Sequence, residues 1–571
     1  MSFRAAVRAR LPFSAEAGRR DAVLAGLLAL FALAVRLYGI TDRMFSHPEN
    51  FVAGVPMPEW VVPPSRRVDL ASLYLGTLED GHPPLYFAFM LFWTKLFGHG
   101  LFALRLPSAL AGAASVLVVH RLGLRLLRDR GGALLAAALV ALHGFHVYWS
   151  QFARPYALAA LLVLLSTLLL LTVEERGGKS AALAYGGVTT AALWTQLYAW
   201  PVVFVHVLWL AWRSLRWRYL PAAAPPLLGA LVLAMPVVAL ALHQNPGNRW
   251  NQSPWTYFAF GHTLSAVGGF RGEAVQPSLG PAAWSLVVLT LLLVGAGALA
   301  ARTRPTALTA EPAAAACPKG RACFGVLAAV TLLSTGLIAW FAATVDPLRA
   351  SARSLLLACA ALPPLLALVG GIWSGFVARG RPTPAAGARE RRVLLAALAL
   401  LPLIAMVAVS RFRGVLVVRG TVVFVPFLLL AVTAGVVALR RTRWLSAAAC
   451  AATLLLAAMS IGIFREAAGT RNDSRGLATA LAVQLRPGDL VLVSNDYRTS
   501  ALLYNFPPEQ RRQFAALDDG PARLAERPRR VWIVRWNEEP PHSPEWDEME
   551  GFALAGEVRG ERHAAAARYE R

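Results

Sequence analysis

The stretch Ala157–Val173, ALAALLVLLSTLLLLTV, decides the fold class of this chain. It carries no charge, and its length approaches the roughly 20 apolar residues that a membrane-spanning helix needs. A second long apolar run covers Ala22–Val35. The 571 residues are 57% hydrophobic and 15% charged, whereas soluble chains carry about 25% charged residues. These features predict a polytopic α-helical membrane protein.

Apolar runs of this kind recur along the chain and predict about thirteen transmembrane helices. They lie near residues 22–40, 103–121, 131–149, 156–173, 181–198, 200–213, 221–242, 283–301, 324–343, 355–375, 393–409, 421–438 and 444–463. The first run follows a basic tail, is long enough to span, and precedes no small-residue cleavage site. It therefore predicts a signal anchor rather than a cleaved signal peptide.

The formal net charge of +24 is carried almost wholly by arginine. In a soluble protein this excess would suggest nucleic acid, but here the arginines cluster on alternate loops between apolar runs. Cytoplasmic loops of membrane proteins carry such an excess. We therefore expect a multi-pass membrane protein with a cytoplasmic N-terminus, an external C-terminus, membrane lipids around it and no nucleic-acid partner.

The apolar run Pro83–Phe97 requires a decision, because the parity of the basic loops is kept only if it does not cross the membrane. At about 1.5 Å per residue it reaches about 22 Å, short of the hydrocarbon core. Pro83 and Pro84 suit a helix start, and Gly98 suits its end. We expect an interfacial or re-entrant helix on the external side. The alternative is a tilted span with a compensating error elsewhere.

The chain changes character after its last apolar run. We expect a transmembrane domain over residues 1–463, with a first external loop over 41–102, and a small soluble external α/β domain over 464–571. The predicted elements of the second domain are strands at Leu490–Ser494 and Arg530–Arg535 and a helix at Thr499–Tyr504. Residues 540–571 predict a loosely ordered end.

Acidic residues gather in the first loop, at both of its contacts with apolar sequence. Asp42 follows the first run, and Glu79, Asp80 and His82 precede Pro83–Phe97. Acids against membrane-embedded surface are costly and suggest a site. Such a cluster raises one pKa for general-base chemistry or binds a divalent cation. For a single acid, a solvated loop position is the ordinary interpretation, and we place the remaining acids of the loop, Glu49, Glu59 and Asp69, at the surface.

Arginines on the predicted external side form a second group, opposite to the usual bias. They are Arg105, Arg154, Arg349, Arg353, Arg411, Arg413 and Arg419. Guanidinium groups form bidentate bonds to phosphate, which predicts an anionic phosphate ligand. A salt bridge or a lipid headgroup contact explains any one of them equally well.

Other candidate sites are weaker. His143 and His146 have a spacing that suits a metal on a helix, but no carboxylate is adjacent, so packing or interfacial hydrogen bonding is favoured. The four cysteines imply no disulfide framework and no metal site. The chain has no Walker A loop, Rossmann fingerprint, HExxH or GxSxG motif. This argues against a nucleotide-driven pump and against the common hydrolases.

Several of these segments together resemble a known family. They are Asp42, Gly81–Tyr86, Leu96–Gly98, Phe102–Leu110, His146–Leu158 and Arg486–Val493. This pattern is similar to that of bacterial family-39 glycosyltransferases of the GT-C class. These membrane enzymes are related to protein O-mannosyltransferases and to the aminoarabinose transferase of lipid A. The likeness is specific over about residues 42–158 and extends in outline over the whole chain.

The resemblance implies transfer of a sugar from a polyprenyl-phosphate donor at the external face of the bacterial cytoplasmic membrane. Asp42 would deprotonate the acceptor hydroxyl, and the sugar would be transferred with inversion. Arg105, Arg154, Tyr156, Arg349 and Arg419 would hold the phosphate of the donor, and Glu79, Asp80 and His82 would support a metal or the acceptor. A divalent cation is possible and not required. The acceptor would be a lipid, a glycan or a protein.

Two positions depart from the family pattern. The family usually has Asp-Glu where this chain has Asp42-Arg43, and often Gln-Glu-Ala-Arg where it has Gln151-Phe152-Ala153-Arg154. One carboxylate is lost at each position. Two other hypotheses therefore stay open: a transporter or flippase of a lipid-linked saccharide, and a non-catalytic scaffold of the cell envelope. A transporter would place acids deep inside broken helices, whereas here they gather in one loop.

Overall fold

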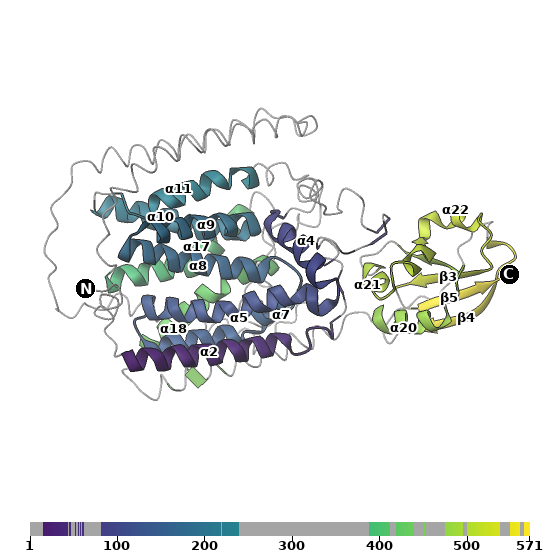
Figure 1. Ribbon diagram of the computed structural model, residues 1–571, viewed down its shortest axis with the longest axis horizontal. Coiled ribbons are helices and arrows are strands. Elements are labelled where there is room, and N and C mark those ends of the chain that lie inside the picture. The colour runs from purple at the N-terminus through teal and green to yellow at the C-terminus, as the bar shows by residue number, and fades with distance from the viewer. Residues whose placement is uncertain are drawn as a thin grey trace, which may run out of the picture.

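A computed structural model of the protein has a helical bundle at one end and a smaller α/β unit at the other (Figure 1). It describes residues 15–43, 82–217, 220–238, 387–410, 418–438, 474–494, 499–536, 549–559 and 565–571, together with isolated residues of 45–61 and 447–454. The predicted spans at 283–301, 324–343, 355–375 and most of 444–463 lie outside the described residues, as do Glu79, Asp80, Arg349, Arg353, Arg411 and Arg413.

Most helices of the bundle run roughly alongside one another, and a short one at the end nearer the α/β unit runs in a different direction (Figure 1). They are α2 (Ala15–Leu37), α4 (Leu85–Phe97), α5 (Leu101–Leu126), α6 (Arg130–Leu142), α7 (Gly144–Ser150), α8 (Tyr156–Arg176), α9 (Lys179–Thr195), α10 (Trp200–Trp217), α11 (Ala224–Leu233), α17 (Ala388–Ser410) and α18 (Val425–Ala438), with the 3-10 turns η3 (Leu197–Ala199) and η5 (Val418–Val423). α5 packs against α2, α6 and α8, and α8 also packs against α9. One continuous apolar core joins these helices.

Two of the described helices, α5 and α8, are long and apolar enough to cross a membrane. The pair α6 and α7, bent by 57°, would be a third if it forms one span. The described helices therefore do not confirm the predicted count of thirteen, although the mostly helical fold is confirmed. α4 has 13 residues, or about 20 Å of length. It begins after Pro84 and ends at Gly98, which has φ +76°, as the sequence predicts for a short helix.

The bend between α6 and α7 is stabilised by Arg36 of α2. The chain leaves helical geometry at His143, so the last carbonyls of α6 lose their helical partners. Nη1 of Arg36 donates to the carbonyl of Ala141 (3.2 Å) and Nη2 to that of Val140 (3.1 Å). Nη2 also lies 3.0 Å from Nδ1 of His146. His146 thus serves hydrogen bonding inside the bundle, in line with the favoured interpretation of the histidine pair.

The α/β unit contains a five-stranded mixed sheet. Its strands are β1 (Leu490–Val493), β2 (Phe514–Ala516), β3 (Arg530–Arg535), β4 (Ala553–Arg559) and β5 (Ala565–Glu570), in the order β2-β1-β3-β5-β4. β1 is parallel to β2 and β3, and β5 is antiparallel to β3 and β4. Helices α20 (Ser474–Gln484), α21 (Thr499–Tyr504) and α22 (Gly520–Leu524) accompany the sheet. The two predicted strands and the predicted helix are confirmed.

The predicted loose order of residues 540–571 is wrong for β4 and β5. β5 has the sequence Ala-Ala-Ala-Arg-Tyr-Glu, and alanine favours helices rather than strands. It nevertheless lies between β3 and β4 and pairs with both. Backbone hydrogen bonds to two neighbouring strands therefore outweigh the local preference of these residues.

The apolar residues of the sheet alternate between its two faces. Leu490, Leu492, Val531 and Ile533 belong to one small core. Val491, Val493, Trp532 and Val534 belong to another, which also includes Phe45 and Met57 of the first loop and Tyr86 and Met90 of α4. The α/β unit therefore shares a hydrophobic core with the first loop.

Candidate active site

The first loop is fastened to the bundle by a buried ion pair between Glu49 and Arg105. Nε and Nη2 of Arg105 each donate to Glu49 over 2.8 Å, and both side chains are 1% exposed. Nη1 of Arg105 donates to the carbonyls of Ile40 (2.7 Å) and Arg43 (2.9 Å). The backbone N–H of Ala153 donates to Glu49 over 3.0 Å. One carboxylate thus connects the loop, α5 and the segment that leads to Arg154.

Burial by itself raises the pKa of Glu49, but the Arg105 guanidinium and the N–H donors of Ala153 and Ser46 lower it further than burial raises it. The pKa of Glu49 is therefore below its ordinary value, and the carboxylate is charged at neutral pH. The expectation that Glu49 is a surface residue is wrong. No local pattern reveals the pair, because its partners are 56 residues apart.

A second cluster brings together five residues from four parts of the chain. Nη2 of Arg154, in the turn between α7 and α8, donates to Nε2 of His82 over 2.6 Å. The ring centres of His82 and Tyr156 are 6.3 Å apart. Arg419 of η5 and Gln196 at the end of α9 are both close enough to His82 to influence its pKa. We call His82, Arg154, Tyr156, Gln196 and Arg419 the cationic cluster.

The electrostatics of the cationic cluster favour an anion. Burial lowers the pKa of His82 well below its ordinary value, and the charges of Arg154 and Arg419 lower it further, although the Gln196 side chain acts in the opposite direction. His82 is therefore neutral at pH 7. Because a guanidinium only donates hydrogen bonds, Nε2 of His82 accepts and its proton lies on Nδ1.

The remaining polar groups of the cluster are also mostly donors. The hydroxyl of Tyr156 is buried and has no hydrogen-bond partner among the described residues. Arg154 is 2% exposed and is held in place by its own carbonyl, which accepts from Ser108 over 3.2 Å. Two guanidinium groups, an imidazole N–H and a phenol thus lie together, and a phosphate is the kind of ligand that satisfies such a set.

Gly420 is required for this arrangement. A Cβ at this position would overlap the ring of Tyr198. The absence of a side chain lets η5 approach η3, which begins directly after Gln196 and carries Tyr198. The two turns therefore bring Arg419 and Gln196 to the same place.

Asp42 lies on an exposed turn, outside the cationic cluster. Its backbone N–H donates to the carbonyl of Gly39 over 3.2 Å, and Gly39 has φ +65°. The next residue, Arg43, donates to the side-chain oxygen of Gln151 over 2.9 Å. The amide nitrogen of Gln151 in turn donates to the carbonyls of Arg36 (2.9 Å) and Tyr38 (3.0 Å). The turn of Asp42 is thereby tied to the segment that carries Arg154.

The structure thus brings together four of the predicted site residues, His82, Arg154, Tyr156 and Arg419. Arg105 instead donates to Glu49 and to two backbone carbonyls. A role for Arg105 in phosphate binding stays a prediction. Sequence reasoning missed Glu49 and Gln196. Among the described residues, no three His, Cys, Asp or Glu side chains gather as a metal site would need.

Comparison with known proteins adds a family. Residues 81–243 match the family model described as dolichyl-phosphate-mannose-protein mannosyltransferase. This stretch contains His82, Arg105, Arg154 and Tyr156, but neither Asp42 nor Arg419. No curated protein matches the chain.

Solved structures that match the chain include ArnT from Cupriavidus metallidurans bound to undecaprenyl phosphate. It is 14% identical with a TM-score of 0.39, over 95% of this chain and 97% of that chain. The same protein in its apo state is 16% identical with a TM-score of 0.39, over 97% of this chain and 98% of that chain. The Archaeoglobus fulgidus oligosaccharyltransferase in its apo form is 12% identical with a TM-score of 0.40, over 90% of this chain and 69% of that chain.

The family match is independent of these structures and includes the motifs around His82 and Arg154. The chain is similar to the dolichyl-phosphate-mannose-protein mannosyltransferase family over residues 81–243, and this match confirms the resemblance to GT-C membrane glycosyltransferases that its motifs predict.

Proposed function

We propose that this protein is an integral membrane glycosyltransferase. It transfers a sugar from a polyprenyl-phosphate donor to a lipid, glycan or protein acceptor at the external face of the bacterial cytoplasmic membrane. The observation that carries the proposal is the convergence of Arg154, Arg419, His82 and Tyr156 on one buried place. The family's description, which names a dolichyl-phosphate sugar, supports the same class of donor.

In the proposed reaction, Asp42 accepts the proton of the acceptor hydroxyl as that oxygen attacks the anomeric carbon. The bond between the anomeric carbon and the phosphate oxygen breaks, and the configuration inverts. The polyprenyl phosphate leaves with the electron pair of that bond. Arg154 and Arg419 stabilise the negative charge that develops on the leaving phosphate, and the Tyr156 hydroxyl donates to it. No nucleotide is consumed.

The link between Asp42 and the cationic cluster supports this division of roles. Arg43 is bonded through its side chain to Gln151 and through its carbonyl to Arg105. Gln151 lies three positions before Arg154 in the same turn. The general base and the phosphate site are therefore held by one connected set of hydrogen bonds, although they come from different parts of the chain.

Two variants of the full-length protein in lipid nanodiscs test the proposal. Arg154→Gln should weaken binding of undecaprenyl phosphate by about tenfold or more, because it removes a charge-assisted hydrogen-bond donor. The matched control is Arg121→Gln, which removes an exposed arginine near the C-terminal end of α5. It should bind undecaprenyl phosphate normally.

Asp42→Asn should retain undecaprenyl phosphate binding but lose transfer by about 10²- to 10⁴-fold, the usual contribution of a general base. Transfer is measured by mass spectrometry of envelope lipids and glycans in a deletion strain complemented with each variant. Full complementation by Asp42→Asn would contradict the proposed mechanism. Normal lipid binding by Arg154→Gln would contradict the proposed donor site.

A further inference from the structure

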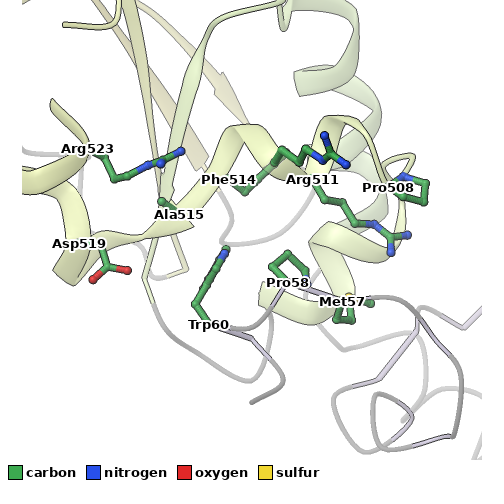
Figure 2. A pocket seen from close by; sticks show the side chains of 10 residues that line it. Met57, Pro58, Trp60, Pro508, Arg511, Phe514, Ala515, Asp519 and Arg523 are labelled. Atoms are coloured by element: carbon green, nitrogen blue, oxygen red, sulfur yellow. The ribbon is translucent and has the colours of Figure 1, made fainter. Parts of the chain in front are cut away.

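A pocket of about 480 Å³ lies between the first loop and the α/β unit. The first loop contributes Met57, Pro58 and Trp60, and the α/β unit contributes Pro508, Arg511, Arg512, Phe514, Ala515, Asp519 and Arg523. In the view of Figure 2, the Trp60 ring lies between the side chains of Asp519 and Pro58. The volume is within the range of about 300–1,000 Å³ that is usual for small-molecule sites.

The two walls of this pocket are held together by specific contacts. The rings of Phe45 and Tyr504 stack with centres 4.1 Å apart. The Tyr504 hydroxyl donates to the carbonyl of His99. Burial, with the negative charge of Glu49, raises the pKa of Tyr504 to about 12, so the phenol stays protonated. Nη2 of Arg475 donates to the carbonyl of Thr41 over 2.7 Å. The pocket is therefore formed by two surfaces with fixed relative positions.

The three arginines of the pocket have different surroundings. Arg511 is buried, and its Nε donates to the carbonyls of Leu503 (2.9 Å) and Phe506 (2.8 Å), so it supports the wall. Arg512 is exposed and has no hydrogen bond or ion pair with the described residues. Arg523 is half-buried and pairs over 3.0 Å with the exposed Glu526, a contact of small energetic value at a surface. Arg512 and Arg523 are thus the two cations suited to a ligand.

The other lining residues suit a sugar ring. The flat indole of Trp60 is a surface on which a pyranose packs with its C–H groups, and its N–H is a hydrogen-bond donor. The carboxylate of Asp519 is exposed and accepts hydrogen bonds from hydroxyl groups. Arginine is the side chain that best binds carboxylate and phosphate groups. An aromatic platform, an acceptor for hydroxyls and two cations together describe an anionic saccharide.

We propose that this pocket binds the acceptor through an anionic saccharide, carrying either a phosphate or a carboxylate group. The inference rests on the proposed glycosyltransferase function and deepens it. Its position is suitable, because the first loop that forms one wall also carries Asp42, and Arg475 bonds the α/β unit to the residue before Asp42. The pocket and the proposed general base are thus both built on the first loop.

Binding of simple probes to the full-length protein in nanodiscs tests the proposal, with calorimetry as the readout. Glucose 1-phosphate and glucuronic acid represent the two anion sources, and glucose and inorganic phosphate are the controls. At least one anionic sugar should bind about tenfold more tightly than both controls. Tighter binding of glucose 1-phosphate identifies the anion as a phosphate, and tighter binding of glucuronic acid identifies it as a carboxylate. Equal binding of glucose 1-phosphate and inorganic phosphate, with no binding of glucuronic acid, would overturn the proposal.

Variants locate this binding in the pocket rather than at the cationic cluster. Trp60→Ala and the double variant Arg512→Gln/Arg523→Gln should each weaken binding of the anionic sugar by about tenfold or more. Arg529→Gln, at an exposed arginine of the same unit that does not line the pocket, should not. If only Arg154→Gln weakens binding of the anionic sugar, the pocket is not the binding site and the proposal fails.

Undecaprenyl phosphate binding separates this proposal from the proposed function. The pocket variants should bind that lipid normally and should raise the KM for acceptor in transfer without a matching change in kcat. Loss of sugar binding in a protein that still binds the lipid would count against the pocket alone. A protein that binds the anionic sugar but not the lipid would leave the pocket standing and contradict the proposed donor.

Discussion

The guanidinium carbon of Arg43 lies 4.6 Å from the centre of the Phe152 ring and 4.0 Å from that of Tyr148. Arg43 and Phe152 are the two positions at which the chain departs from the family pattern, where a carboxylate is usual at each. The two departures are in contact with each other in the folded protein. This cation–π contact holds the turn of Asp42 against the turn of Arg154.

The coupling between Arg43 and Phe152 is measurable. A double-mutant cycle with Arg43→Met and Phe152→Ala should give a coupling free energy of about 0.5–2 kcal/mol, the range for cation–π pairs. Both single variants should also reduce transfer, because the turn of Asp42 loses a fixed position. Thermal unfolding in nanodiscs and the complementation assay provide the two readouts. Strictly additive effects on stability would show that the contact has no energetic weight.

The pair of Glu49 and Arg105 should be a strong determinant of stability. Glu49→Gln leaves a buried guanidinium without its counter-charge, and breaking a buried pair in this way costs about 3–5 kcal/mol. The double variant Glu49→Leu/Arg105→Met removes both charges and should be more stable than either single variant. Thermal unfolding of the purified proteins measures the order. A single variant as stable as the wild type would contradict the structural role of the pair.

Acid sensitivity should follow from the same carboxylate. The pKa of Glu49 is lowered in the folded protein, so its contribution to stability is present above its unfolded pKa and is lost as the pH falls through the folded value. The wild type should therefore lose stability below about pH 4.5 more steeply than Glu49→Gln, which has no such contribution. Unfolding temperatures measured from pH 7 to pH 3.5 give the comparison. If the unfolding temperatures of the two proteins change in parallel with pH, Glu49 does not cause the acid sensitivity.

The buried, neutral ring of His82 should cause a separate loss of stability in mild acid. Its folded pKa is lowered well below 6.5, so the unfolded chain binds the proton more readily. Its contribution is fully present above the unfolded pKa and decreases by about 1.4 kcal/mol for each pH unit below it. His82→Gln should remove this dependence between pH 6.5 and pH 5. An unchanged pH dependence in that variant would show that His82 is not buried as a neutral ring.

A network remote from the proposed site offers a test of specificity. Nη1 of Arg213 in α10 is 2.8 Å from Glu390 of α17, and its Nε is 3.5 Å from Glu174 of α8. Arg213→Met leaves two carboxylates together and should lower the unfolding temperature by several degrees. Undecaprenyl phosphate affinity of the folded protein should remain unchanged, because the network does not include the cationic cluster. A parallel loss of lipid affinity would contradict that separation.

The sequence by itself determined the helical class, the short helix α4 between Pro84 and Gly98, and the motifs that hold His82, Arg154 and Tyr156. These features depend on local signals: runs of apolar residues, proline and glycine at helix ends, and the spacing of residues within a motif. The strands at 490–493 and 530–535 were predictable for the same reason, since their β-branched and aromatic residues favour strands.

Only the tertiary structure decided which charges meet. Glu49 looks like any loop acid until Arg105, Ala153 and Ser46 surround it, and Gln196 has no motif to mark it. The pocket at Trp60 needs two surfaces that are more than 400 residues apart in the chain. Ion pairs, β-pairing and pockets of this kind depend on distance in space. Because the free energy of such contacts comes from burial and geometry, no single segment of sequence carries their signature.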